Sequence, residues 1–266
     1  MLAIEKIRKI TPENLPPLTI LTGDDLGQFE LFKDEFLKQI HYDPADLNVT
    51  LFDMKETSYA DVELDLVSLP FFADEKIIIL DHFADLTTAK KRYLSDEELK
   101  SFEQYLEAPS GTTKLVIFAE GKLDSKRRLV KILKRDGQIF EAAEIKETDL
   151  RQYFTKQAQL EGLDFAPKAF DHLLIKSGFH FSEISKNLAF LKSYKESGQV
   201  SLEDITEAIP KTLQDNIFDL TQLILQKQID AARSLVRDLT LQGEDEIKLI
   251  AIMLGQFRMF TQVKIL

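Results

Sequence analysis

The chain has 266 residues, of which 44% are hydrophobic and 30% charged, with a formal net charge of −11 and no cysteine. This balance excludes wholesale disorder, and the length suits about two domains. The missing cysteines exclude disulfides, thiol nucleophiles and cysteine zinc sites, and the acidic charge repels nucleic acid and anionic membranes. No apolar stretch reaches the roughly 18 residues of a membrane span and no secretory signal is visible, so we expect a cytoplasmic protein with no membrane partner.

Strand and helix patterns alternate along the first 145 residues. Short apolar runs bounded by turn residues predict buried strands over residues 15–23, 47–54, 76–81, 114–119 and 138–142. Helical spacing of apolar side chains lies between them, over residues 28–40, 59–66, 95–110 and 125–134. Ser95 and Glu98 form a capping box that starts the third of these helices. The alternation predicts a parallel α/β sheet with helices on both faces.

Beyond Thr148 the strand patterns stop, and the remainder is predicted to be helical. The helices are separated near Gly162, Gly178, Gly198, Pro210 and Gly243. Ser201 and Asp204 mark another start of the capping-box kind. We therefore predict three domains: an α/β domain over 1–146, a small helical domain over 147–210 and a C-terminal helical domain over 211–266.

The loop after the first predicted strand stands where nucleotide-binding folds hold phosphate. A phosphate loop needs glycines, a lysine and a serine or threonine in the pattern GxxxxGK[ST]. Residues 23–30 read GDDLGQFE and contain three carboxylates, which would repel a triphosphate, but no lysine, serine or threonine. The Gly-Lys pair at Gly121 lacks the preceding glycine. We therefore predict a correctly placed but chemically disabled phosphate site and no cofactor.

Catalytic and metal-binding patterns are equally weak. Asp81 and His82 follow the strand at 76–81, with Asp85 nearby, and such residues can ligate metals or move protons. The favoured interpretation is a strand end that turns into solvent. The other histidines lack ligand spacing, and no GxSxG motif exists. We therefore expect neither a metal site nor catalysis.

The segment SLPFFA, residues 68–73, is a candidate binding element between a helix and a strand. Pro70 interrupts the helix, and two adjacent phenylalanines, Phe71 and Phe72, cannot both point into the core. An exposed Phe beside Leu69 would suit a partner's pocket, with roughly 1.5–3 kcal/mol for each side chain buried. The alternative is that both phenylalanines plug the sheet edge.

A basic stripe over residues 122–135 is the second candidate. Its cations, which alternate with apolar residues, include Lys126, Arg127, Arg128, Lys131 and Lys134. The stripe could contact DNA or an acidic partner. It lacks the interleaved aromatic residues that stack on bases, and the alternative is the solvated face of an amphipathic helix.

Five stretches in order resemble the delta subunits of bacterial DNA polymerase III, which belong to the clamp loader. They are PLTILTG with its lysine-less loop, SLPFFADEKIIIL, TTKLVIFAEGKLDSKRRLVKIL, the helical pair SEISKNLAFLKSY and SLEDITEAI, and the segment from NIFDLTQL to FTQVK. The resemblance covers essentially the whole chain. It implies an AAA+-like α/β domain without a functional phosphate loop, a helical lid and a C-terminal helical collar.

The resemblance also implies a function. The family binds the sliding clamp (the beta subunit) and holds one of its interfaces open for loading on primed DNA. Its partners are the other loader subunits, delta prime and gamma/tau, and it is a non-ATPase subunit of a DNA-directed DNA polymerase holoenzyme. The family's clamp contact falls here on Leu69, Phe71 and Phe72, with Ser68 and Pro70 shaping the turn.

The chain departs from the family at its carboxyl end, and two alternative functions remain open. Members continue for several more helices, whereas this chain ends at Leu266 inside an apolar pattern, so the collar is expected to be incomplete. The alternatives are an active AAA+ nucleotide hydrolase, which the disabled loop disfavours, and a DNA-binding protein that uses residues 122–135, which the net charge disfavours.

Overall fold

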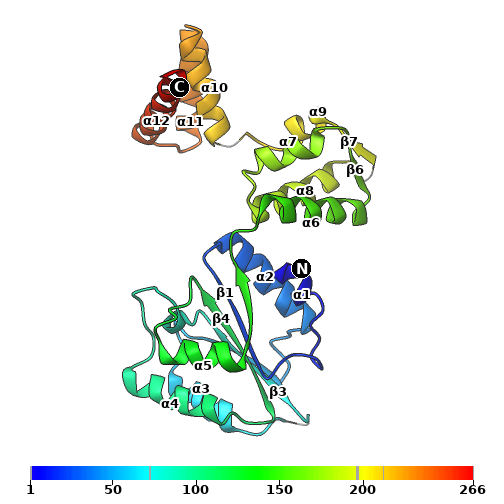
Figure 1. Cartoon of the computed structure of the whole chain (residues 1–266), viewed down its shortest axis with the longest axis vertical. Helices are drawn as coiled ribbons and strands as arrows, with labels where there is room; N and C mark the ends of the chain where they lie inside the picture. Colours follow the sequence, from blue (N-terminus) through cyan, green and yellow to red (C-terminus); the bar gives the residue numbers. More distant parts are fainter. Residues whose placement is uncertain (1, 72, 196–197, 212, 266) are drawn as a thin grey trace. The chain divides into compact units, whose positions relative to one another are not determined.

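The computed structural model describes residues 2–71, 73–195, 198–211 and 213–265 (Figure 1). Its contacts divide the chain into two units. The first contains the residues up to Lys156 together with Phe179–Ser185, and the second contains Gln157–Gly178 and the residues from Lys186 onward. The boundaries that we place near 146 and after Pro210 stay a prediction.

The first unit is built around a parallel five-stranded sheet in the order β2-β3-β4-β1-β5. The strands are β1 (Leu18–Gly23), β2 (Val49–Asp53), β3 (Lys76–Asp81), β4 (Thr113–Glu120) and β5 (Gln138–Ala142). The helices are α1 (Ala3–Ile7), α2 (Leu26–Gln39), α3 (Tyr59–Val67), the 3-10 helix η1 (Ala84–Leu86), α4 (Asp96–Glu107) and α5 (Arg128–Asp136). The strands and the longer helices are those that the apolar patterns predict, and the capping box at Ser95 is present.

Side chains from alternate strand positions fill the two faces of the sheet. On one face, Ile78 and Ile117 pack with α3, α4 and α5, where Phe102 is fully buried. On the other face lies α2 (Figure 1). Its Phe36 meets Phe118 edge-on with 5.7 Å between ring centroids. Because all strands run parallel, one edge of the sheet collects the amino ends of the strands and the opposite edge their carboxyl ends. The functional candidates lie on these two edges.

The remaining chain is mostly helical, as predicted, with two differences. The helices are α6 (Glu147–Leu160), α7 (Ala169–Lys176), α8 (Phe181–Lys195), α9 (Leu202–Ala208), α10 (Leu213–Leu225), α11 (Ile229–Leu241) and α12 (Glu246–Ile265). Two three-residue strands, β6 (Leu163–Phe165) and β7 (Gly198–Val200), pair in parallel, so the expectation that strands stop after Thr148 is wrong. A helix break at Lys227, in left-handed conformation, was also not predicted. Within the described residues, none of the helices combines the length and apolarity that crossing a bilayer requires.

Candidate functional site

The turn between α3 and β3 exposes apolar side chains at the amino-terminal edge of the sheet. Leu69 is 76% exposed and Phe71 is 62% exposed. Ser68 and Pro70 are half-buried, and Phe72 lies outside the described residues. The interpretation in which both phenylalanines plug the sheet edge is therefore wrong for Phe71. An exposed Leu and Phe this close together are what a partner's apolar pocket can cover.

The last two turns of α3 extend this apolar surface. The helix buries Tyr59, Val62 and Leu66 against the sheet, yet Leu64 and Val67 are also apolar and are 71% and 63% exposed. Residues three apart lie on one side of a helix, so Leu64 and Val67 share a face. We call Leu64, Val67, Leu69 and Phe71 the apolar segment.

The opposite edge of the sheet carries the loop from β1 to α2, and its own residues occupy the place of a phosphate. The Asp25 carboxylate caps α2 by accepting a hydrogen bond from the Gln28 amide at 3.0 Å. The Asp25 amide donates to the Ala142 carbonyl at 3.3 Å. A side chain at Gly27 would meet the Ser182 hydroxyl at 2.5 Å. An aspartate on the helix terminus and this close packing do not fit a nucleotide phosphate, which needs free amides and a cation there.

Beside this loop, Asp81 ends β3 in a buried ion pair. Its carboxylate lies 2.6 Å from the Lys33 ammonium of α2, and the Asp81 side chain is only 8% exposed. Asp85 is fully buried and accepts from the Tyr93 amide at 3.0 Å. The predicted strand end in solvent is therefore wrong for both residues, because each carboxylate is buried and accepts a hydrogen bond or pairs with a cation inside the fold. The second Asp85 carboxylate oxygen, Oδ1, has no hydrogen-bond partner among the described residues. Among the described residues, no cluster of three acidic or histidine side chains could hold a metal.

His82 follows in a left-handed conformation with φ of 57°, and its Nδ1 lies 3.0 Å from the Asp53 carboxylate. Burial on its own would raise the pKa of Asp53. Hydrogen bonds from the Lys55 amide and the His82 ring outweigh it, and the charges of both residues add to them, so the pKa lies below its ordinary value. At the carboxyl-terminal edge, Asp81 thus pairs with Lys33 and Asp53 with His82.

The predicted basic stripe is the outer face of α5 and the turn before it. Leu129 and Val130 are buried, whereas Lys126, Arg128, Lys131 and Lys134 are exposed. Arg128 pairs with Glu107 of α4 at 2.5 Å. Arg127 is half-buried, lies 3.3 Å from Asp124 and donates to the Asp85 carbonyl. The helix is amphipathic with its cations on the exposed face, and both the contact with DNA or an acidic partner and the alternative of a merely solvated face stay predictions.

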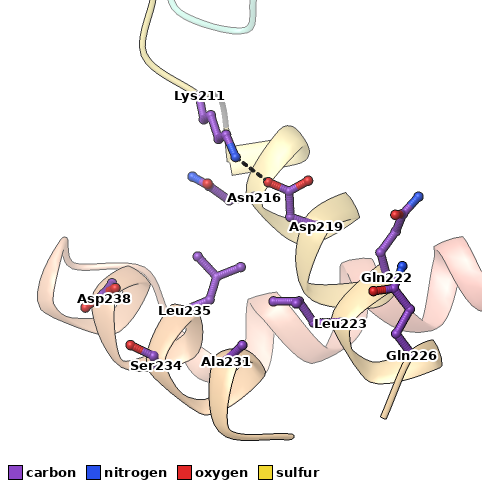
Figure 2. Close-up of a pocket in the computed structure, with 10 residues that line it drawn as sticks. All are labelled: Lys211, Asn216, Asp219, Gln222, Leu223, Gln226, Ala231, Ser234, Leu235 and Asp238. Carbon is purple, nitrogen blue, oxygen red and sulfur yellow. Dashed lines mark hydrogen bonds and ion pairs between the residues drawn. The ribbon is translucent and has the colours of Figure 1, made fainter. Parts of the chain in front are cut away.

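A polar cavity of about 560 Å³ lies between α10 and α11. Figure 2 shows the amides of Asn216 and Gln222 and the Asp219 carboxylate around it, with Lys211 paired to Asp219 at 2.6 Å. Its lining mixes these polar groups with Leu223, Ala231 and Leu235, none of which is among the large exposed apolar side chains. It is a weaker candidate than the apolar segment.

Two family models match the chain. The model of the DNA polymerase III delta subunit matches residues 20–143, and the model of that subunit's C-terminal domain matches residues 214–266. Together they cover more than half of the sequence. The chain belongs to the DNA polymerase III delta subunit family. The first match contains both edges of the sheet, including the apolar segment.

Similar proteins of known identity support this family assignment. The DNA polymerase III subunit delta of Bacillus subtilis (strain 168) is 26% identical over 230 residues, which are 85% of this chain and 65% of that protein. The chain thus spans slightly less than two thirds of that curated relative's length. The solved structure of the Bacillus subtilis DNA clamp loader delta protein has a TM-score of 0.66 at 23% identity, covering 96% of this chain and 76% of that one. This likeness, together with the strand order, confirms the predicted parallel α/β sheet followed by helical regions.

Sequence reasoning missed two features of this delta-family site. Leu64 and Val67 stand out of phase with the buried positions of α3, a signal that was available in the sequence. The buried lysine that begins β3, Lys76, gave no such signal, because its partners are known only once α3 is placed against the sheet. The contact residues Leu69, Phe71, Phe72, Ser68 and Pro70 stay predictions.

Proposed function

We propose that this chain is the subunit of a clamp loader that binds the sliding clamp and opens it for loading on primed DNA. The observation that carries the proposal is the exposed pair Leu69 and Phe71 on a turn that the delta-subunit family model covers. Delta prime and gamma/tau subunits would be its partners in the cytoplasm. The proposal assigns it no catalytic step of its own.

Burial of the exposed pair supplies the affinity. Full burial of a Leu or Phe side chain contributes roughly 1.5–3 kcal/mol, and interface anchors of this kind cost about 2 kcal/mol or more when truncated. Asp61, Glu63 and Asp74 surround the apolar segment in sequence, and exposed charges of this kind form the polar rim of such interfaces. The segment therefore suits an apolar pocket on the clamp.

Clamp opening requires only a preference for one clamp conformation. A protein that binds the open clamp better than the closed clamp shifts the equilibrium toward the open form by the difference in its binding free energies. No covalent chemistry enters this mechanism. The self-capped helix at Asp25 and the paired Asp81 support a role in which the ATP-dependent steps belong to other subunits.

The decisive experiment measures binding of the full chain to the sliding clamp of the same organism without nucleotide, by surface plasmon resonance. We expect the Leu69→Ala/Phe71→Ala variant to bind about 100-fold more weakly, from two anchors of at least about 1.4 kcal/mol each. The matched control is Leu160→Ala/Ile175→Ala, which removes two side chains that are 71% and 64% exposed in the second unit. This control is expected to bind like the parent.

Failure of the parent chain to bind the clamp would overturn the proposed function. Equal binding by the parent and the Leu69→Ala/Phe71→Ala variant would keep the family role and move the contact elsewhere. For the basic stripe, a contact with primed DNA or with a partner inside the complex stays a prediction, on Lys126, Arg127, Arg128, Lys131 and Lys134. The test for them is salt-dependent DNA binding by the assembled loader.

A further inference from the structure

A buried lysine ammonium group contacts the end of α3, within the apolar segment. Lys76, the first residue of β3, is 5% exposed although it is charged. Its Nζ donates to the Ser68 hydroxyl at 2.7 Å, to the Asp65 carboxylate at 2.9 Å and to the Asp65 carbonyl. A lysine ammonium has three N–H donors, so each one finds an acceptor. All three acceptors belong to the last turn of α3 or to the residue that ends it.

The same contacts cap the helix. The last carbonyls of an α-helix lack partners within the helix, and its carboxyl end carries a partial negative charge that favours a cation. The Lys76 ammonium group supplies this cation and donates a hydrogen bond to the backbone carbonyl of Asp65. Thr113, the register partner of Lys76 on β4, supplies a hydroxyl 3.5 Å from the Leu66 carbonyl. Side chains from two neighbouring strands therefore hold the helix end from which Leu69 and Phe71 project.

A second buried lysine holds the other end of the turn. Lys114 of β4 lies opposite Ile77 of β3, and its side chain is 9% exposed. Its Nζ lies 2.6 Å from the Glu75 carboxylate and donates to the Pro12 carbonyl at 2.8 Å. Ser68 before the exposed residues and Glu75 after them are thus each held by a lysine at the amino-terminal edge of the sheet.

Stability alone does not account for these buried contacts. A buried ion pair is seldom more stabilising than apolar residues of similar size, and its well-attested uses concern conformational specificity. Exposed Leu and Phe side chains gain free energy by folding back onto apolar surface, so an untethered turn would collapse. A turn held open before binding also loses less conformational entropy on binding.

We propose that Lys76 is a positioning residue for clamp binding, which through Asp65 and Ser68 holds Leu69 and Phe71 outward, with Lys114 as the second tether. This inference rests on the proposed function. It predicts that removal of the Lys76 contacts weakens clamp binding although no clamp-contacting side chain changes.

The test compares two ion pairs at opposite ends of β3. Lys76→Met/Asp65→Asn removes the tether without leaving an unpaired charge. The matched control, Lys33→Met/Asp81→Asn, removes the pair at the carboxyl end of the strand. We expect the first variant to bind the clamp about tenfold more weakly, from the cost of ordering two side chains and their turn, and the control to bind like the parent. Amide hydrogen exchange in the free chain should accelerate at residues 68–75 of the first variant only.

The outcomes separate this inference from the proposed function. If the parent binds and Leu69→Ala/Phe71→Ala does not, but Lys76→Met/Asp65→Asn binds like the parent, the positioning role is wrong and the function stands. Equal weakening by the two ion-pair variants would also overturn it, because the effect would then be global. If the first variant does not fold, Asp65→Asn alone takes its place, because Asp65 is not a predicted contact residue. A loss of about threefold with faster local exchange supports the role, and unchanged binding overturns it.

Discussion

At its amino end β3 begins with buried Lys76, and at its carboxyl end it finishes with buried Asp81. Each residue reaches a partner on a neighbouring helix, Asp65 of α3 at 2.9 Å and Lys33 of α2 at 2.6 Å. At the amino end the pair lies at the base of the turn that exposes Leu69 and Phe71. At the carboxyl end it lies beside a self-capped helix and a closed loop. The same pairing of charges can therefore support a binding surface at one edge of a sheet and seal the other edge.

The surroundings of the two pairs explain the difference. The Asp65 side chain is 26% exposed, so solvent shares its charge, whereas the Asp81 side chain is 8% exposed. The carboxylate at the carboxyl end therefore depends more on its lysine than the carboxylate at the amino end does. Stability should therefore respond more strongly to removal of the lysine at the carboxyl end, and clamp binding to removal of the lysine at the amino end.

The largest effect is expected from Lys33→Met, which leaves the Asp81 carboxylate buried without its cation. We expect a loss of about 3–5 kcal/mol in the free energy of unfolding, measured by urea denaturation. Lys76→Met should cost only about 1–2 kcal/mol, since Asp65 stays partly solvated. In the control Lys33→Met/Asp81→Asn most of the loss should be recovered. A loss from Lys33→Met no larger than that from Lys76→Met would contradict the contrast between the two edges.

Gly23→Ala tests how tightly the carboxyl-terminal edge is closed. Gly23 has a φ of 143°, and a Cβ there would lie 2.0 Å from the Ala142 carbonyl oxygen. Backbone strain and this overlap should cost about 3 kcal/mol of unfolding free energy. Gly111→Ala is the matched control, because a Cβ at Gly111 meets nothing within 4 Å, and it should change stability by less than about 0.5 kcal/mol. Similar losses of unfolding free energy in the two variants would mean that the backbone around Gly23 shifts easily to admit a Cβ atom.

Local chemistry explains which parts of these edges the sequence predicts. The bounds of β3 and β5 follow from apolar runs between turn residues, and the starts of α4 and α9 follow from capping boxes at Ser95 and Ser201. The pairing of β6 with β7 joins Leu163 to Gly198, which no local pattern records. The disabled phosphate loop could be predicted from missing residue types. The ion pairs could not, because they depend on which helix lies over each end of β3.

A smaller effect is expected from Leu64→Ser/Val67→Ser on α3. If the clamp contact extends along the whole apolar segment, this variant should bind about three- to tenfold more weakly. Its stability should stay within about 0.5 kcal/mol of the parent, because both side chains are exposed. Leu160→Ser/Ile175→Ser removes apolar groups of matching exposure and should leave clamp binding unchanged. Parent-like binding by Leu64→Ser/Val67→Ser would confine the contact to the turn itself.

The smallest effect concerns the Asp53 carboxylate beside His82. Because its pKa is lowered in the folded state, Asp53 stabilises the fold above its unfolded pKa, and this contribution is lost as the pH falls through the lowered value. His82→Asn keeps a residue that tolerates the left-handed conformation but removes the imidazole. We expect the pKa of Asp53 to rise toward the ordinary aspartate value, as measured by NMR titration of its carboxyl carbon.

The Lys55 amide should keep part of the lowering, because it donates to the same carboxylate at 2.9 Å. His41→Asn is a close control, since His41 also has a positive φ, of 54°, and lies outside this cluster. An unchanged Asp53 pKa in His82→Asn would show that the Lys55 hydrogen bond alone sets it. The carboxyl-terminal edge would then be closed by the backbone and by Lys33 without the imidazole. Clamp binding should not change in His82→Asn, because this substitution leaves the amino-terminal edge intact.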